Sequence, residues 1–572
     1  MEFIYGISKE EATKRTSDEY LTHIKLLHQN SPEYESLSDS EKKVIYHLCR
    51  AGYWIEKISY NLENKNNLPF YNYVKTKAMA GDEYSQNILR LFVAQKGINS
   101  LDSNGDQINL AEGIDDRPGL NVYQFTMSTE NFHKLLNDML DNGEIEEVKK
   151  ILSARTIVKY DGNKLYAVDY VDEYKEDFLK VANELDLATD VCDDANFKEY
   201  LIAQSAAFKE ADTKLDAKAD MLWAKLKDCK LEFTVTRENY EDNLTTTVFD
   251  NTELTSKFEK FGIEAVPKDS LGTRIGIINK EGTELLDSLT SLNDIASKLM
   301  PFNNEYSSEE CTTETNQVAV DVDLIALTGN EGAYRASIVL AQNLPNSDKL
   351  AVKLGGGRRN CYHRQIRTTK SSNLNEILID EKFLKYFNLD AMHWATIEHE
   401  NTHSLGPKNI KDLGAYASIL EEYKADMGIY AFLKEYENAG IFTSEQVKEI
   451  VVTELFGSFT KAKPHLTQAH RVRSVMIVNR MFETGAMDFV NNKLIFDFDK
   501  VIETSKLMLE EVVRLQLDRS ASKAKEYVQK YFVWTDRLQT IANIIKQHSK
   551  KLNGELQRPI FDESTNDLNM EA

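Results

Sequence analysis

The order of apolar and polar residues divides the chain into a helical first part, a middle part with strands and a helical last part. Apolar residues recur at helical spacing through most of residues 1–228 and again beyond the middle part to the C-terminus. Two short runs of β-forming residues, 156–158 and 165–168, flank Asp161-Gly162. This arrangement predicts a hairpin within the first helical part.

The middle part has the pattern of a sheet or small barrel. Residues 231–236 alternate between apolar and polar, and short apolar runs follow at 274–278, 318–322 and 336–340. A glycine turn, Gly355-Gly356-Gly357, precedes one more predicted strand. This turn lacks the Lys-Ser/Thr of a phosphate-binding loop and the spacing of a dinucleotide fingerprint, so we interpret it as a plain turn.

Composition restricts the class of protein. A chain of 572 residues is too long for one core, and 42% hydrophobic with 28% charged residues is typical of an ordinary globular protein. The formal net charge of −23 argues against nucleic acid and anionic membranes as partners. The five scattered cysteines lack CxxC spacing, which indicates reduced thiols in the cytoplasm. The N-terminus has no signal-peptide pattern, and no apolar run is long enough to span a membrane.

The last part carries the pentapeptide His399-Glu400-Asn401-Thr402-His403. On a helix, histidines at i and i+4 project from one face, so both imidazoles can bind a single cation while Glu400 stands beside it. The flanking sequence predicts that helix, because Asp390 can serve as its N-cap and Gly406-Pro407 follows as a stop signal. The motif therefore predicts a helical metal site.

A catalytic zinc site usually has three protein ligands and one position open to water, so a third ligand is needed. Residues 421–426 have the sequence Glu-Glu-Tyr-Lys-Ala-Asp and lie in a stretch whose apolar residues have helical spacing. Glu422 and Asp426 fall on one face of this second helix. One of them can bind the metal while the other orients a ligand histidine through its second ring N–H.

These two segments resemble the dipeptidyl peptidase III family of zinc exopeptidases, in its shorter branch that includes Nudix-linked plant proteins. The resemblance rests on the H-E-x-x-H motif with Leu405-Gly406-Pro407 and on residues 421–426, and it extends from about residue 117 to the C-terminal helices. Better-known members have one more residue between the histidines and the motif E-E-C-R-A-E/D. Here Tyr423 and Lys424 replace the Cys and Arg, neither of which is a ligand, so the resemblance still implies a zinc site.

The resemblance implies a role for each residue of that site. Glu400 would be the general base and acid, and Glu421 and Asp426 would hold the two histidines from behind. The implied zinc ligands are His399, His403 and Glu422.

The resemblance also implies substrate-binding residues. Glu238-Asn239-Tyr240 matches a segment whose glutamate holds the N-terminal ammonium of the peptide and whose tyrosine stabilises the transition state. Asn343 and Asn346, in Asn343-Leu344-Pro345-Asn346, would grip the free N-terminus and the peptide backbone. His470, near the start of a helix that runs to Gly485, resembles the second catalytic histidine. Each has a plainer alternative: a packing tyrosine, turn asparagines and a structural histidine.

The fold implied is α+β, with two lobes and a cleft, a mainly helical lobe that carries the zinc and a mixed lobe with a small β-barrel core. The expected domain boundaries are a lower lobe at 1–258 with a helical N-terminal part and the first strands, a helical insertion into the zinc lobe at 259–325, further lower-lobe strands at 326–372, the helical zinc lobe at 373–504 and C-terminal helices at 505–572.

The expected function is a monomeric, cytoplasmic, zinc-dependent exopeptidase that releases dipeptides from short peptides with a free N-terminus. Two alternatives remain. One is a zinc aminopeptidase that releases single residues, with its ammonium anchor closer to the metal. The other is a non-catalytic peptide-binding protein on the same fold, which would have no need for the base Glu400.

Overall fold

The chain forms two compact units. The computed structural model describes residues 2–17, 26–27, 29–101, 107–114, 120–237, 242, 244–288, 291–306, 318–329, 341–344, 358–362, 374–407, 410–466 and 468–548. Unit 1 comprises Met1–Ile278, Val322–Val339 and Asn553–Ala572, and unit 2 comprises Asn279–Asp321 and Leu340–Leu552. Both contain helices and strands, which confirms the α+β class.

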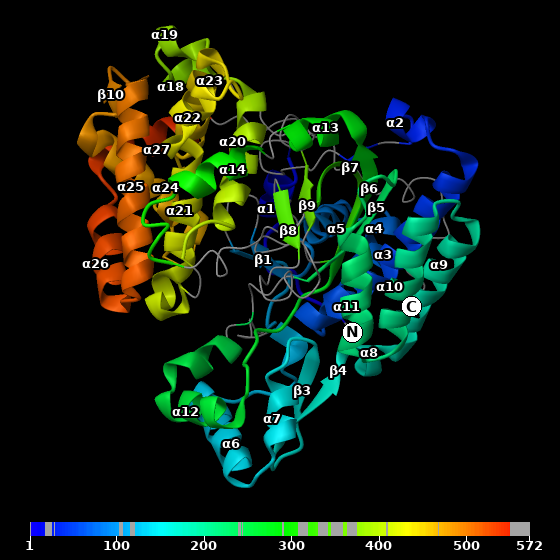
Figure 1. Cartoon of the computed structure of the whole chain (residues 1–572). Helices are drawn as coiled ribbons and strands as arrows, with labels where there is room; N and C mark the ends of the chain where they lie inside the picture. The colour runs from blue at the N-terminus through cyan, green and yellow to red at the C-terminus, as the bar shows by residue number, and fades with distance from the viewer. Residues whose placement is uncertain are drawn as a thin grey trace. The chain divides into compact units, whose positions relative to one another are not determined.

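Unit 1 is built on three long helices that pack side by side, α3 (Asp39–Glu63), α9 (Lys175–Val191) and α10 (Ala195–Lys209) (Figure 1). A capping box of Ser38 and Glu41 starts α3, whose apolar residues at helical spacing are buried. The remaining helices of unit 1 are α1 (Lys9–Arg15), α2 (Pro32–Glu35), α4 (Asn67–Met79), α5 (Glu83–Gln95), η1 (Leu120–Val122), α6 (Thr129–Asp141), α7 (Ile145–Ile151), α8 (Tyr170–Glu173), α11 (Thr213–Ala224), η2 (Thr245–Asp250) and α12 (Thr252–Phe261).

Three two-stranded ladders occur in the described residues. The predicted hairpin is confirmed as β3 (Thr156–Tyr160) and β4 (Leu165–Asp169), with Gly162 at φ 98° in its turn. A pair that the sequence did not indicate, β1 (Asn99–Leu101) and β2 (Gln107–Asn109), lies earlier in unit 1. In unit 2, β10 (Met487–Val490) and β11 (Lys493–Phe496) form a hairpin.

A five-stranded sheet forms the core that the sequence predicts as a sheet or small barrel. Its strand order is β5-β6-β7-β9-β8. β5 pairs antiparallel with β6, β7 pairs parallel with β9, and β8 pairs antiparallel with β9. The strands are β5 (Leu231–Thr236), β6 (Gly272–Asn279), β7 (Val318–Gly329), β8 (Ala341–Leu344) and β9 (Arg358–Cys361).

The sheet confirms the predicted strands at 231–236, 274–278 and 318–322 and the strand after the glycine turn. The predicted strand at 336–340 and the turn Gly355-Gly356-Gly357 lie outside the described residues. Asn343, which the sequence places in a turn, is in strand β8. The pairing of β8 with β9 accounts for this difference, because the ladder extends the strand to Leu344, directly before Pro345.

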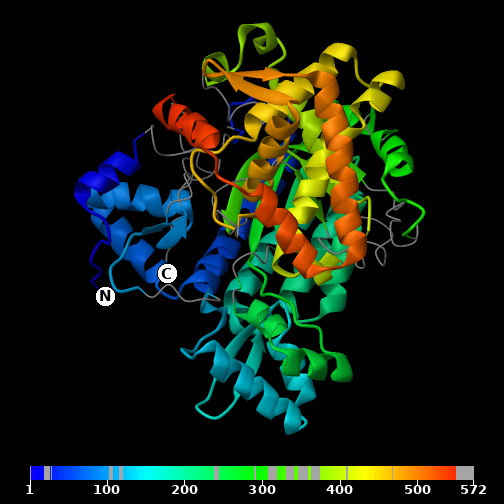
Figure 2. The ribbon, with the colours of Figure 1, turned by 90° about the vertical axis from the view of Figure 1, so that its left-hand side faces the viewer.

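Unit 2 is mainly helical, and α21 (Ala417–Ala431) is its central helix (Figure 1). It packs against α20 (Leu389–His403), α24 (Ala469–Thr484) and α25 (Phe498–Asp518), and Figure 2 shows the β10–β11 hairpin leading into the long helix α25. The other helices of unit 2 are α13 (Lys280–Ser288), α14 (Ser291–Leu299), α18 (Leu374–Leu378), α19 (Glu381–Leu384), η3 (Ile410–Tyr416), α22 (Leu433–Asn438), α23 (Ser444–Gly457), α26 (Ala521–Tyr531) and α27 (Asp536–His548).

Close contact between α20 and α21 depends on a glycine. A Cβ atom on Gly428 of α21 would come within 1.9 Å of Thr402 Oγ1 on α20, and within 2.7 Å of the Thr402 Cβ. Only a residue without a side chain permits this approach. The two helices that carry the predicted metal ligands are therefore held at short range.

No helix in the described part of the chain combines the length and apolar character that a bilayer crossing requires.

Candidate metal centre

Helix α20 presents the two histidines of the predicted motif. It begins at Leu389 with Asn388 as the N-cap, whose side chain accepts a hydrogen bond from the backbone N–H of Asp390. The predicted N-cap, Asp390, is wrong, because Thr453 and Glu449 on α23 hold Asn388 in the capping position. The helix itself is confirmed and runs through the whole motif to His403.

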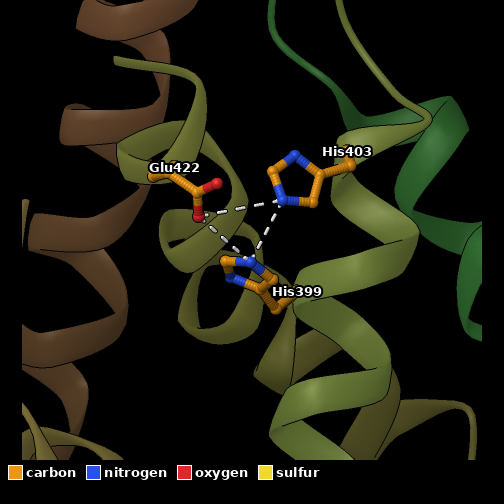
Figure 3. Close-up of side chains that lie close together, drawn as sticks. All are labelled: His399, His403 and Glu422. Carbon is orange, nitrogen blue, oxygen red and sulfur yellow. Dashed lines mark hydrogen bonds and ion pairs between the residues drawn. The ribbon is translucent and has the colours of Figure 1, made fainter. Parts of the chain in front are cut away.

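Three side chains from two helices converge on one point (Figure 3). His399 and His403 come from α20, one turn apart, and Glu422 comes from α21. The two Nε2 atoms are 3.1 Å apart, and the Glu422 Oε2 atom lies 3.4 Å from Nε2 of His399 and 3.9 Å from Nε2 of His403. Ligand atoms at ~2.0–2.1 Å from a tetrahedral zinc ion are about 3.3–3.4 Å from one another. The spacing fits one small cation.

The opposite ring nitrogens of both histidines contact carboxylates. Nδ1 of His399 is 2.8 Å from Asp426 Oδ1, and Nδ1 of His403 is 3.0 Å from Glu421 Oε1. A carboxylate accepts, so these contacts favour the tautomers with the proton on Nδ1. Both Nε2 atoms then carry lone pairs that face each other and an anionic oxygen. A bound cation is the natural partner for three such acceptors.

The charges of the centre also fit a divalent cation. Two permanent cations face its carboxylates: Lys424 Nζ is 2.9 Å from Glu421 Oε1, and the guanidinium of Arg473 bonds Asp426. Four carboxylates outnumber the two cations, which leaves an excess of negative charge that a bound cation would offset. The four carboxylates are Glu400, Glu421, Glu422 and Asp426.

Two of these carboxylates, Glu421 and Glu422, are held ionised. Burial would raise the pKa of Glu421, but the Lys424 ammonium and the contact with His403 lower it to about 2. Burial likewise opposes ionisation of Glu422, and contacts with His399 and His470 hold its pKa well below the usual range. Burial lowers the pKa of Arg473 to about 10 against the opposing effect of Glu422, so this residue keeps its charge at neutral pH.

His470 lies beside the centre on the first turn of α24. Its Nδ1 is 3.0 Å from Glu422 Oε2. Partial desolvation lowers the pKa of His470, but the contact with the Glu422 carboxylate raises it by more. The helix predicted to run from this segment to Gly485 is confirmed, since α24 ends at Thr484 with Gly485 at φ 71°.

The structure thus brings six of the predicted site residues together: His399, His403, Glu421, Glu422, Asp426 and His470. Glu400 follows His399 directly on α20. Glu238, Tyr240 and Asn346 lie outside the described residues. For Asn343 the structure describes the backbone, as part of β8.

Sequence reasoning did not identify three supporting residues. Lys424 and Arg473 pair with the carboxylates, and Gln516 Nε2 donates to Glu421 Oε2 at 2.9 Å. Arg473 follows His470 by three residues and therefore shares its helix face, which is a signal that the sequence contains. Gln516 comes from the distant helix α25, and nothing in its local sequence indicates this contact.

Two solved structures share this architecture, and one curated protein is similar in sequence. No family model matches the chain. Nudix hydrolase 3 of Arabidopsis thaliana is 26% identical over 463 residues, which is 74% of this chain and 55% of that protein, so the chain spans about half the length of this relative. A solved structure of DPP III from Caldithrix abyssi matches with a TM-score of 0.78 and 21% identity, covering 94% of this chain and 98% of that one. Dipeptidyl-peptidase III from Corallococcus sp. strain EGB matches with a TM-score of 0.76 and 18% identity, covering 96% and 97%. The chain has the dipeptidyl peptidase III fold.

Proposed function

We propose that this protein is a zinc-dependent exopeptidase that releases dipeptides from the free N-terminus of short peptides. The observation that carries the proposal is the convergence of His399, His403 and Glu422, each backed by a charged neighbour, next to Glu400 on a fold shared with dipeptidyl peptidase III. Shared fold alone does not determine function, so the site carries the argument.

Zinc suits this donor set. Two imidazole nitrogens and one carboxylate oxygen, with a fourth position left for water, form a ligand set known from catalytic zinc sites. When bound there, zinc would lower the pKa of its water toward ~7 and polarise the carbonyl of the substrate. Asp426 and Glu421 fix the orientation of the two imidazoles, and this support from behind is what such ligands require.

Glu400 moves the proton. It follows His399 directly on α20, so its carboxylate stands beside the ligand histidines. In the proposed reaction it takes a proton from the attacking water and then gives it to the leaving amine. His470 and Tyr240 would donate to the carbonyl oxygen as it gains negative charge, each worth about 3 kcal/mol when well placed.

Dipeptide length requires an anchor at a fixed distance from the metal. Glu238 would bind the N-terminal ammonium, while Asn343 and Asn346 would bind the first residues of the peptide, so that the second peptide bond reaches Glu400. These assignments rest on the sequence resemblance. They give the proposal its distinctive consequence, because a blocked N-terminus should prevent cleavage.

The test is product analysis on an unblocked peptide of about five residues, a length that leaves several bonds open to attack. Mass spectrometry would identify the products that the wild-type protein forms as purified, after treatment with a chelator, and after zinc is restored. We expect dipeptides that disappear with chelator and return with zinc, and no cleavage of the N-acetylated peptide. Single amino acids as first products would establish the aminopeptidase instead, and binding without cleavage would establish the non-catalytic alternative.

A further inference from the structure

Strand β9 carries a buried arginine that reaches the metal-binding helix. Arg359 is 4% exposed, and its Nη1 donates to Oδ1 of Asn401, 2.6 Å away on α20. A guanidinium removed from water is costly unless charged or polar partners surround it. Asn401 is one of the two central residues of the H-E-x-x-H motif that the proposed chemistry does not use.

Asn401 is also bound from within α20. Its Nδ2 donates to Glu398 Oε2 at 3.4 Å, and the hydroxyl of Tyr436 donates to the other oxygen of Glu398. The amide of Asn401 therefore has one defined orientation, with its oxygen toward Arg359 and its nitrogen toward Glu398. All of these groups are buried. The result is a fixed polar link from β9 through α20 to α22.

This link lies on the side of α20 that faces away from the metal. Asn401 follows His399 by two residues, which places it about 200° around the helix from that ligand. Glu398 and Asn401, three residues apart, share this rear face. The front of α20 thus holds the metal ligands, while its back is tied to a strand.

Strand β9 is the partner of β8. The antiparallel ladder places Asn343 opposite Arg359 and Ala341 opposite Cys361. Helix α20 also packs against β8. The buried contact of Arg359 with Asn401 therefore connects the metal-binding helix to the two-strand ladder in which Asn343 lies.

We propose that Arg359 and Asn401 are positioning residues that set the distance between the metal-binding helix and strand β8, and so fix which peptide bond reaches Glu400. The inference rests on the proposed function and deepens it. Both residues would act through the position of α20 relative to the ladder and not on the substrate itself. If the link is removed, α20 and the ladder can shift relative to each other, and a displacement of ~1 Å costs up to about 100-fold in rate.

The experiment compares wild-type protein with Arg359→Met, Asn401→Leu and the double variant, each supplied with zinc. Arg358→Met is the matched control, because Arg358 is equally buried and lies one residue earlier on β9, so its side chain points to the opposite face. Arg359→Lys, which keeps a cation, is measured alongside in case the methionine variant does not fold. Zinc content, thermal midpoint, kcat, KM and product lengths from one unblocked peptide are recorded for each.

We expect kcat of each single variant to fall by about 10- to 100-fold, with zinc content and KM close to those of the wild type. The share of products other than dipeptides should rise, a change that lower stability alone would not cause. The double variant should be no slower than the slower single variant, since both remove the same link.

Three results would overturn the positioning role. They are reductions in kcat that multiply in the double variant, loss of zinc from the variants, and a product pattern like that of Arg358→Met. A wild-type protein that releases no dipeptides would instead contradict the proposed function, and the inference with it. The two failures are therefore distinguished by the wild-type measurement alone.

Discussion

Glu421 offers the sharpest test of how the centre is supported, because Glu421→Gln changes one charge and almost no volume. Its carboxylate accepts from His403 Nδ1, from Lys424 and from Gln516. Lys424 is 1% exposed, and its ammonium also donates to the carbonyl of Leu405. Glutamine would leave this buried cation without its counter-charge and would weaken the hydrogen bond that orients the His403 ring.

The pKa of Glu421 gives the magnitude. The folded protein lowers it from 4.5 to about 2, which corresponds to about 3 kcal/mol of preference for the anion at ~1.4 kcal/mol per tenfold change. Glutamine still offers one oxygen to His403 or Lys424, so we expect the metal-free protein to lose about 1–3 kcal/mol. Zinc affinity should fall by about 10- to 100-fold, the usual cost of removing a partner behind a ligand histidine.

Competition with a chromophoric chelator measures the affinity, and denaturant unfolding of the metal-free protein measures the stability. Glu445→Gln is the control, because Glu445 is an exposed glutamate in the same unit, on the first turn of α23. The smallest expected loss of zinc affinity is about tenfold. If the affinity of Glu421→Gln is within about threefold of the wild-type value, the supporting role of Glu421 is refuted.

The same variant has a pH signature. Since the folded pKa of Glu421 is depressed, its contribution to stability is complete above the unfolded value of 4.5 and is lost as pH falls toward about 2. Wild-type protein should therefore lose more stability than Glu421→Gln across this window. Equal acid sensitivity of the two proteins would show that the carboxylate carries no such coupling.

Three further predictions follow from the proposed chemistry. Glu400→Gln should retain one zinc per chain but lose turnover, because it removes the base and no ligand; metal analysis with an activity assay checks both. Tyr240→Phe should lower kcat by about 10²–10³ with KM little changed, and near wild-type kcat in a stably folded variant would remove the hydroxyl from the mechanism. Glu238→Ala should cost about 2–5 kcal/mol in recognition of the free N-terminus, so N-acetylation of the peptide should harm the variant little further.

Local sequence was enough to predict the β3–β4 hairpin, four strands of the central sheet and the helices that carry the candidate site. Helical spacing and a terminal glycine predicted α24, and alternation predicted β5. The differences arise where distant contacts override the local signal. Asn388 caps α20 because residues of α23 hold it in place, and Asn343 lies in a strand because β9 supplies a pairing partner. Neither partner is close in sequence.

The candidate site divides in the same way. His399 and His403 could be paired from the sequence because fixed helical spacing determines which side chains share a face. The same spacing placed Glu422 and Asp426 on one face of the second helix but did not decide which of the two faces the histidine Nε2 atoms. The contacts of Gln516 with Glu421 and of Arg359 with the opposite face of α20 were not predictable, because each comes from an element whose packing only the folded chain defines. Spacing within one helix can be computed from the sequence, whereas the approach of a strand or a third helix depends on packing across the whole unit.

Tyr423 and Lys424 stand where the motif that the sequence resembles has Cys and Arg, and neither belongs to the proposed ligand set. Tyr423 points into the core, where its hydroxyl is 3.4 Å from that of Tyr527. Lys424 keeps a positive charge against Glu421. An arginine at this position could form two parallel bonds with a carboxylate, whereas lysine acts as a point charge and here divides its bonds between Glu421 and a backbone carbonyl. We therefore expect the metal centre to depend on the presence of a buried cation at position 424 and not on whether lysine or arginine supplies it. Lys424→Arg should bind zinc as the wild type does, whereas Lys424→Met should bind it more weakly. Equal zinc affinities of the two variants would contradict this reasoning.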